Sequence, residues 1–512
     1  PQVMLHRIKE VQKRGAKLIV IDPRQEGLGK IADWWIPITP GSDGALALAI
    51  LKMIISSGRY DHEFVEKYTR GFEEFKTYMD TQTMEQLSKW CGISVTDIEK
   101  LTDIFCSTAK IPLVAYTGLE YQLSAIQNNR AIFVLWAITG KLDAPGAIYL
   151  NAKGLETPKL FEIPEDDKPI GVDEFPLFYK FSGQGQFSRF PKAVLEDEPY
   201  PVRGLMILGG SPVLSFPDSK SWREAYKKLD CLIVLDRYFT EDARYADVVF
   251  PACSLFEVPK AVPGPEGPHI AESLIEPVGE SKNDVLIMGA IAKKLGFGDK
   301  LPQTEEELRS WLLSGTAPYA GDFGTSADQK KEKHYKKYET GELRADGKPG
   351  FPTPSGKLEI CSTILEENGF VPYPEYKDVR SIPELAGKEY PFTMTSGARS
   401  NNRMGVFGAN LDKIAEIEPY PFVDINAEDA KEIGIEDGDM VKVITPFADG
   451  TFKAKIRGIA RHAIHIPHGG GSAYMAEPWK TGNVNDLCSL DYADPMTGFV
   501  LIKSVPCRVE KV

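Results

Sequence analysis

The sequence contains one short unit twice, and this duplication restricts the possible folds more than any other feature. Asp22 ends the apolar run LIVI and is followed, after nine residues, by ADWWIP; Asp236 ends LIVL and is followed, after nine residues, by ADVVFP. Both copies fit LIV-[IL]-D-x9-A-D-x-[WV]-[IF]-P at an offset of 236 − 22 = 214 residues. An ungapped match of this length indicates two copies of one structural unit.

Each copy is typical of a helix that leads into a buried parallel strand. Residues 3–15 and 220–229 place apolar side chains close to helical spacing, and the strands after them are apolar throughout, as doubly covered parallel strands are. A carboxylate at the carboxyl end of such a strand stands where open α/β sheets bind nucleotides. The alternative is that Asp22 and Asp236 only cap turns. The duplication favours nucleotide binding.

An earlier strand is recognisable in the second copy only. Residues 205–215, LMILGGSPVLS, are apolar and then glycine-rich, so that the backbone can approach a phosphate. Subtracting the offset puts the counterpart of GGSP at 209 − 214 = −5 to 212 − 214 = −2, upstream of Pro1. We therefore expect the first unit to lack its opening strand, which either a longer polypeptide or another chain would supply.

Further segments of the first unit have a local pattern. In PGSDGALALAILKMI, residues 40–54, a turn opens an apolar helix, so Asp43 lies near a helix N-terminus, where a carboxylate and backbone donors can bind a polar base. Simple capping fits Asp43 equally well. Residues 111–122 predict a strand leading into a loop, and residues 127–142 predict a buried helix.

The pattern of apolar and polar residues changes from about residue 388. Short alternating strands, small turns and one short helix predict a compact β-barrel. His462, His465 and His468 have a spacing that resembles a metal site, but on a strand the outer two share one face and the middle one points away, which argues against metal binding. His468, before three glycines, is expected to line a site.

Composition excludes several other classes of protein. The net charge of −13 argues against a nucleic-acid surface, which needs clustered Lys and Arg. The longest apolar run, residues 44–55, is interrupted by Lys52 and is far shorter than a membrane span, so we expect no direct membrane insertion. The seven cysteines are scattered without any CxxC, which is typical of reduced and mostly buried residues.

Several segments resemble one family over nearly the whole chain. They are the two copies of the repeated unit, PGSDGAL, TGLEYQ, LGGSP, TPSGKLEI, TSGARSNN and GNVNDL. The chain is similar to the catalytic subunit of the molybdopterin oxidoreductase (dimethyl sulfoxide reductase) family without its N-terminal region. The resemblance implies a bis-molybdopterin guanine dinucleotide cofactor with Mo or W. It also implies an α/β fold with two Rossmann-like, doubly wound nucleotide-binding domains and a C-terminal double-psi β-barrel. Two dinucleotides would account for the two copies.

The predicted division of the chain is a first dinucleotide-binding domain at 1–150, an irregular surface excursion at 151–200, a second dinucleotide-binding domain at 201–385 and the dinucleotide-binding β-barrel at 386–512. The resemblance assigns the guanosine end of one dinucleotide to Asp22, Arg24, Gly41 and Asp43, and its pterin side to Gly118 and Gln122. It assigns the other dinucleotide to Ser211, Asp236 and Asp284, and the phosphates and pterin, on the barrel side, to Gly397, Arg399, His468 and Asn485. Ser211 stands where much of the family has asparagine.

Two features of the family are not found in this sequence. The four-cysteine motif for an iron–sulfur cluster is absent, and the segment with the protein ligand to the metal is expected upstream of Pro1. We therefore expect the cluster only in that missing region, and we assign neither a catalytic residue nor a metal ligand.

The resemblance favours a redox enzyme. It would pass oxygen atoms, sulfur or hydride equivalents between a small-molecule substrate and the metal, and electrons to an iron–sulfur partner subunit. One alternative is a non-redox hydratase or transhydroxylase that uses the metal as a Lewis acid. The other is a cofactor-binding subunit that is inactive alone.

Overall fold

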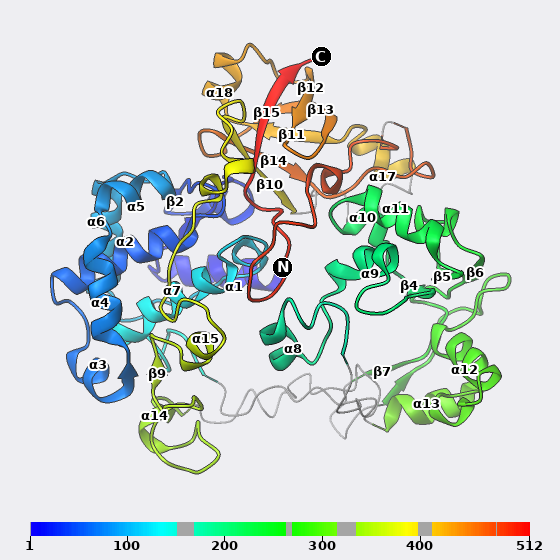
Figure 1. The fold of residues 1–512 in the computed structure, drawn as a ribbon, viewed down its shortest axis with the longest axis horizontal. Helices are drawn as coiled ribbons and strands as arrows, with labels where there is room; N and C mark the ends of the chain where they lie inside the picture. The colour runs from blue at the N-terminus through cyan, green and yellow to red at the C-terminus, as the bar shows by residue number, and fades with distance from the viewer. Residues whose placement is uncertain (1, 151–167, 263–268, 315–333, 398–411, 478) are drawn as a thin grey trace.

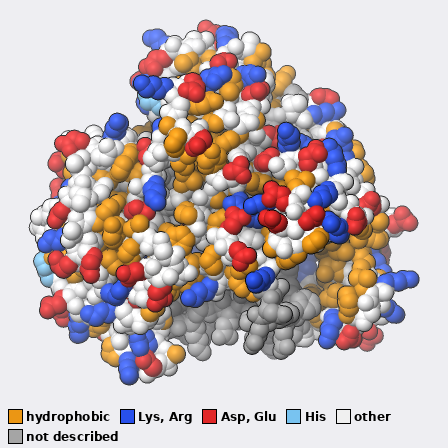
Figure 2. Space-filling view, in the orientation of Figure 1, with side chains coloured by type: hydrophobic (Ala, Val, Ile, Leu, Met, Phe, Trp, Pro, Cys, Tyr) orange, Lys and Arg blue, Asp and Glu red, His pale blue; other side chains and the backbone are white. Residues whose placement is uncertain are grey.

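The computed structural model describes residues 2–150, 168–262, 269–314, 334–397, 412–477 and 479–512. Three lobes surround a common centre: an N-terminal unit in blue and cyan, a second unit in green, and a β-barrel in orange and red above them (Figure 1). Acidic and basic side chains are interspersed over the face seen in Figure 2. In the described part of the chain, no helix combines the length and the apolar character that crossing a membrane requires.

The first unit is mostly helical around a short parallel strand pair. Its elements are α1 (Gln2–Lys13), β1 (Ile19–Ile21), β2 (Trp34–Ile36), α2 (Asp43–Ser56), α3 (His62–Tyr68), β3 (Thr69–Arg70), α4 (Phe72–Thr81), α5 (Met84–Cys91), α6 (Val95–Ser107) and α7 (Ala125–Ile138). The alanine- and leucine-rich α2 is buried over most of its length because α5, α6 and α7 pack around it. It forms the centre of the largest apolar cluster of the described residues.

The predicted strand at 111–122 does not form. The segment is irregular except for a short 3-10 helix at Thr117–Leu119, and the side chains of Val114 and Tyr116 are 66% and 82% exposed. Its alternating apolar residues are typical of a strand, but the segment pairs with none of the described strands. Without a neighbouring strand, the backbone hydrogen bonds of a β-strand cannot be made.

The second unit contains a three-stranded parallel sheet. Its elements are α8 (Pro176–Ser182), α9 (Phe190–Glu196), β4 (Gly204–Leu208), α10 (Pro212–Ser215), α11 (Ser219–Lys228), β5 (Cys231–Asp236), β6 (Val248–Pro251), the hairpin β7 (Lys260–Val262) and β8 (His269–Ala271), α12 (Asp284–Lys294) and α13 (Glu305–Leu313). The strand order is β4-β5-β6. Trp222 of α11 lies fully buried in the core on one side of this sheet.

The duplication extends to register and hydrogen bonds. Ile19 lies opposite Trp34 in the β1–β2 pair, and Ile233 lies opposite Val248 in the β5–β6 pair, one offset later. The backbone N–H of Leu18 donates to Asp33 Oδ2 (2.9 Å), and that of Leu232 donates to Asp247 Oδ2 (2.7 Å). The second aspartate of each copy therefore fixes the start of the strand and is structural.

The segment between the two units is more regular than its composition indicates. Residues 151–167 lie outside the described residues, but 176–196 form α8, a 3-10 helix and α9. Phe190 of α9 stacks on Trp222 with ring centroids 5.7 Å apart, and Val194 is fully buried beside it. The prediction of an irregular surface excursion is wrong for this part, because its aromatic residues complete the core of the second unit.

Residues 334–376, which we expected within the second unit, lie against the first one. β9 (Leu358–Glu359) pairs in parallel with β3, and Ile360 is part of the apolar cluster around α2. This segment also contains α14 (Lys337–Thr340) and α15 (Thr363–Glu367). The side chains of Lys337 and Asp143 form an ion pair in which both are almost fully buried. The predicted range 201–385 is therefore not a single packing unit.

The C-terminal lobe is a closed six-stranded barrel, which confirms the prediction from the alternating pattern. Its elements are β10 (Phe392–Gly397), α17 (Asp412–Ile417), β11 (Phe422–Ile425), α18 (Ala427–Glu432), β12 (Met440–Ile444), β13 (Asp449–Ile456), β14 (Ala463–Pro467) and β15 (Val505–Lys511). The strand order is β10-β14-β11-β13-β12-β15. β10 pairs in parallel with β14 and β11 pairs in parallel with β13, and the other pairs are antiparallel. Apolar side chains from its strands fill the interior.

Candidate functional site: two acidic crevices and the barrel

The first crevice begins at the carboxyl end of β1. Asp22 Oδ1 accepts a hydrogen bond from the backbone N–H of Arg24 (2.8 Å). The Asp22 side chain is exposed, yet the surrounding protein raises its pKa because it partly removes solvent from the carboxylate. We call this end of the strand pair the first crevice, because open α/β sheets bind ligands in the crevice outside the carboxyl ends of their strands. This position suits a carboxylate that receives a ligand.

Asp43, in the first turn of α2, faces the same crevice. Burial, together with the smaller effect of the charge of Asp22, raises the pKa of Asp43 to about 6, and a hydrogen bond with Gln122 acts in the opposite direction. Two carboxyl groups that resist ionising together are a suitable pair of acceptors for N–H and O–H donors of a ligand. The structure thus brings together Asp22, Asp43 and Gln122, which the sequence assigns to one dinucleotide.

Gln122 is held rigidly at the wall of this crevice. Its Nε2 donates to the carbonyl oxygen of Gly118 (2.6 Å), and Asn128 Nδ2 donates to its Oε1 (3.0 Å). Gly41 has φ +89°, and a Cβ there would lie 2.7 Å from both side-chain atoms of Ser504 and 3.3 Å from Gln122 Oε1. Only glycine therefore allows Ser504, which lies in the C-terminal tail just before β15, to pass this closely.

The C-terminal tail places the ammonium group of Lys503 at the first crevice. The backbone N–H groups of Ile502 and Lys503 donate to the carbonyl oxygen of Tyr121, at 3.3 and 3.2 Å. The side chain of Lys503 donates to the carbonyl oxygen of Ser396 at the end of β10. Burial lowers the pKa of Lys503 to about 8, and the carboxylate of Asp22 acts in the opposite direction. The sequence gives no signal for Lys503, because no motif surrounds it.

Gly397 and His468 of the barrel lie beside this lysine. A Cβ on Gly397, which has φ +99°, would collide with Lys503 Nζ and lie 3.7 Å from His468 Nε2. The two predicted barrel residues thus lie close to Lys503, whose charge acts on Asp22 of the first unit. Arg399, the third predicted barrel residue of this group, lies outside the described residues.

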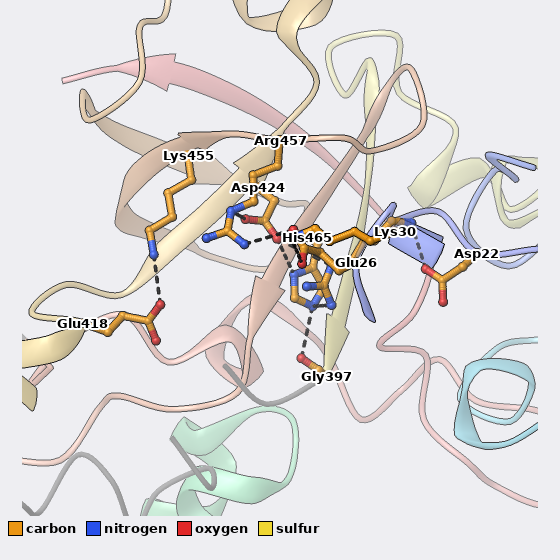
Figure 3. A network of polar contacts seen from close by, with 10 residues as sticks. Asp22, Glu26, Lys30, Gly397, Glu418, Asp424, Lys455, Arg457 and His465 are labelled. Carbon is orange, nitrogen blue, oxygen red and sulfur yellow. Dashed lines mark hydrogen bonds and ion pairs between the residues drawn. The ribbon is translucent and has the colours of Figure 1, made fainter. Parts of the chain in front are cut away.

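A polar network joins the first unit to the barrel (Figure 3). Asp424 of β11 is 1% exposed, and its carboxylate lies 3.5 Å from Arg24 Nε and 3.3 Å from Arg457 Nε. His465 of β14 places Nδ1 3.1 Å from Asp424 Oδ2 and Nε2 3.1 Å from the carbonyl oxygen of Gly397. Burial lowers the pKa of His465, which favours the neutral ring. Arg24 therefore faces the barrel, and its contact with guanosine stays a prediction.

Backbone contacts reinforce this network. The N–H of Gln25 donates to the carbonyl oxygen of Gly458 (2.8 Å), and that of Ala460 donates to the carbonyl oxygen of Pro23 (2.7 Å). The three histidines of the H-x2-H-x2-H spacing are separated, since His465 is buried, His462 is exposed and His468 lies beyond the end of β14. In the described part of the chain, no three His, Cys, Asp or Glu side chains are grouped as a metal site requires.

The second crevice repeats the acidic pair. Asp236 Oδ1 accepts a hydrogen bond from the backbone N–H of Tyr238 (3.0 Å), as Asp22 does from Arg24. Asp284 opens α12, and both burial and the charge of Asp236 raise its pKa. Asp284 Oδ1 is buried and accepts no hydrogen bond from the residues that the structure describes. A buried acceptor without a donor is costly, and a ligand N–H or O–H would satisfy it.

Ser211 and Asn485 each form a hydrogen bond near the glycine-rich turn of the second unit. The hydroxyl of Ser211 donates to Asp242, which also accepts from Tyr226 Oη (2.8 Å). Asn485 Nδ2 donates to the carbonyl oxygen of Leu214 (2.6 Å), whereas its Oδ1 is buried and accepts no hydrogen bond from the described residues. The segment that contains Asn485 thus contacts α10 of the second unit.

Each of the two crevices suits the nucleoside end of a dinucleotide. Each has a carboxyl pair for the donors of a base or a ribose, and each adjoins a barrel segment: Gly397 and His468 at the first, Asn485 at the second. The residues that sequence reasoning missed are Asp424, Arg457, Lys503 and Ser504, whose partners are remote in sequence. For His465, only the histidine spacing gave a signal.

Family models match most of the chain. The molybdopterin oxidoreductase model matches residues 1–294, more than half of the 512, and a model described as "Molydopterin dinucleotide binding domain" matches residues 393–506. The chain belongs to the molybdopterin oxidoreductase family, whose cofactor is a molybdopterin dinucleotide.

Curated relatives and one solved structure agree with this family. The chain is 29% identical to "Probable oxidoreductase YoaE" of Bacillus subtilis over 86% of its length and 63% of the relative. It is 27% identical to acetylene hydratase of Syntrophotalea acetylenica (90% and 67%) and 28% identical to the F420-dependent formate dehydrogenase subunit alpha of Methanocaldococcus jannaschii (91% and 69%). The structure of acetylene hydratase from Pelobacter acetylenicus has the same fold, with a TM-score of 0.82 at 24% identity, covering 99% of this chain and 76% of that one.

Proposed function

We propose that this chain is the cofactor-binding part of an oxidoreductase catalytic subunit that holds two molybdopterin guanine dinucleotides, one in each crevice. The observation that carries this proposal is the repeated acidic pair, Asp22 with Asp43 and Asp236 with Asp284. Guanine presents N–H donors along one edge, and ribose presents hydroxyl donors, so a carboxyl pair suits this end of the cofactor better than the phosphates.

The chain's own residues would bind and orient the cofactor. Asp43 and Asp284, at helix starts, would accept hydrogen bonds from the guanine edges, and Asp22 and Asp236 would accept them from the riboses. Gln122, fixed by Asn128, would present its amide on the pterin side of the first crevice. The bound cofactor would supply a Mo or W centre that exchanges two electrons with a small-molecule substrate.

An electron-transfer partner is part of this proposal. Relatives include proteins named as formate dehydrogenase subunit alpha and as the molybdopterin-containing subunit of thiosulfate reductase, and both names describe one subunit of a larger enzyme. We infer an iron–sulfur subunit as the partner that takes up or delivers the electrons. The chain spans 63–69% of the length of the three relatives described above, so further parts of such an enzyme lie beyond the matched region.

A non-redox reaction is the second candidate. The similarity to a relative named acetylene hydratase, 27% identity over 90% of this chain, favours it. Reductive titration of the holoenzyme with an artificial electron carrier separates the two candidates. Oxidation of the carrier that depends on an added acceptor substrate supports the redox enzyme, whereas hydration of an unsaturated substrate without net electron transfer supports the hydratase.

Release of nucleotide tests the cofactor itself. Acid treatment of the holoenzyme followed by chromatography should give about two GMP per chain, because each copy of the unit holds one dinucleotide. Recovery of CMP, or of no nucleotide, would contradict the proposal.

A further inference from the structure

Lys503 lies where the tail, the barrel and the first crevice meet. It precedes β15, and its backbone is fixed to Tyr121 of the first unit. The next residue, Ser504, is buried against Gly41 at the entry to α2. The backbone of Lys503 is therefore fixed at the first crevice by its own contact and by that of the next residue.

The ammonium group of Lys503 has too few partners for its position. It is half-buried, donates to the carbonyl oxygen of Ser396 and forms no ion pair with any residue that the structure describes. Burial lowers its pKa to about 8, against the attraction of Asp22; the charge of Arg24 acts in the same direction as burial, and that of Cys488 opposes it. An ammonium group with three donors and one carbonyl partner is costly in such a place unless an anion binds it.

The absence of a side chain at Gly397 makes room for this ammonium group on the barrel surface. A Cβ at Gly397 would collide with Lys503 Nζ, so glycine is the residue that allows the amine to lie at the end of β10. His468 Nε2 would lie 3.7 Å from the same Cβ position. The neighbouring Arg24 is paired with Asp424, which leaves Lys503 as the cation next to Asp22 without a carboxylate partner in the described part of the chain.

We propose that Lys503 binds the diphosphate of the dinucleotide whose guanosine end occupies the first crevice. This inference rests on the proposed function and assigns a residue to the phosphates on the first side, where the carboxylates of Asp22 and Asp43 would repel them. A lysine ammonium is a compact charge that binds phosphate oxygens from several directions, which suits the bend of a diphosphate. The residues assigned above to the second crevice include no lysine, so the effect should be confined to one dinucleotide.

Replacement of Lys503 tests the proposal in the holoenzyme. We expect Lys503→Met to release one of two nucleotides about 10- to 150-fold faster than the unchanged protein, which corresponds to the loss of one charge-assisted hydrogen bond. After gel filtration, GMP content should fall from about two towards one per chain. Lys503→Arg should retain more GMP than Lys503→Met because it keeps the charge. Lys442→Met, which removes an exposed lysine paired with Asp449 on β13, is the matched control and should retain both nucleotides.

Three results would overturn the assignment. Unchanged GMP content and release rate in Lys503→Met would show that Lys503 does not hold the dinucleotide, including the case in which it binds only free diphosphate. Equal losses in Lys503→Met and Lys503→Arg, together with a lower Tm of the cofactor-free protein, would show a structural role. Absence of GMP from the unchanged holoenzyme would instead contradict the proposed function, and this inference with it.

Discussion

The aspartates at the carboxyl ends of β1 and β5 can combine two functions in one carboxylate. Asp22 Oδ1 and Asp236 Oδ1 each accept the backbone N–H two residues further on, at 2.8 and 3.0 Å, which caps the turn after the strand. The capping bond uses one carboxylate oxygen, so the other oxygen can accept a hydrogen bond from a ligand. Turn capping and nucleotide binding, which are alternatives in the sequence, are therefore compatible at the same residue.

At Asp43, a structural role at the helix N-terminus and a role in cofactor binding can be separated by measuring stability against pH. Its pKa of about 6 in the folded protein lies above the ordinary value of 3.8, so ionised Asp43 destabilises the cofactor-free protein as pH rises from about 4 to about 6. The destabilisation above pH 6 is at most about 3 kcal/mol. Asp43→Asn should remove it, so that the Tm of the cofactor-free variant at pH 7.5 equals or exceeds that of the unchanged protein and varies less between pH 4 and 6.

Asp43→Asn should weaken cofactor binding, although it stabilises the cofactor-free protein. The side-chain amide introduced by Asp43→Asn offers one acceptor and one donor where the carboxylate offers two acceptors, and such a mismatch with the guanine edge costs about 1–3 kcal/mol. GMP content after gel filtration should therefore fall, and Asp80→Asn, at an exposed position of α4, should change neither property. A drop in cofactor-free stability equal to the loss of cofactor would favour a purely structural role for Asp43.

At the scale of elements, we expect Asp424 to stabilise the joint between the first unit and the barrel, which is the contact of the segment after β1 with β11. This nearly inaccessible carboxylate lies between Arg24 and Arg457 and beside His465, and replacing it by alanine would leave two guanidinium groups without their shared anion. Removing one partner from a buried ion cluster costs about 3–5 kcal/mol. We expect Asp424→Ala to lower the Tm of the holoenzyme clearly in differential scanning calorimetry.

Asp449→Ala provides the comparison for this joint. Asp449 pairs with Lys442 at 3.0 Å, but both side chains are exposed, so its loss should change stability by about 0–1 kcal/mol. Equal shifts in the two variants would show that the joint contributes no more than a surface ion pair does. Limited proteolysis of the Asp424→Ala protein should also cleave between the first unit and the barrel earlier than in the unchanged protein.

Across the whole molecule, the sequence predicts what is repeated or periodic and misses what depends on remote partners. The ungapped repeat predicted both strand-end aspartates, and the alternating pattern predicted the barrel, because these features are local. Arg24 and His465 approach to 3.4 Å although 441 residues separate them, and no spacing in the sequence indicates such a contact. The strand expected at 111–122 failed for the same reason, since a strand requires a neighbour that the segment itself does not specify.

The asymmetry of the two sheets leads to a prediction for the whole molecule. β5 has parallel neighbours on both sides, β4 and β6, whereas β1 pairs only with β2 among the described strands, and its Ile21 is 40% exposed. The open edge of β1 is where the counterpart of β4 and of its glycine-rich turn would lie. Each backbone group left without a partner in a buried crevice costs about 1–3 kcal/mol.

We therefore expect residues 1–512 expressed alone to retain less than stoichiometric metal and GMP and to show no turnover with an artificial electron carrier. Adding an apolar strand with a glycine-rich turn and the segment expected to hold the metal ligand, in cis or as a partner chain, should restore both. Stoichiometric molybdenum and substrate reduction by residues 1–512 alone would show instead that the first crevice is complete as it stands.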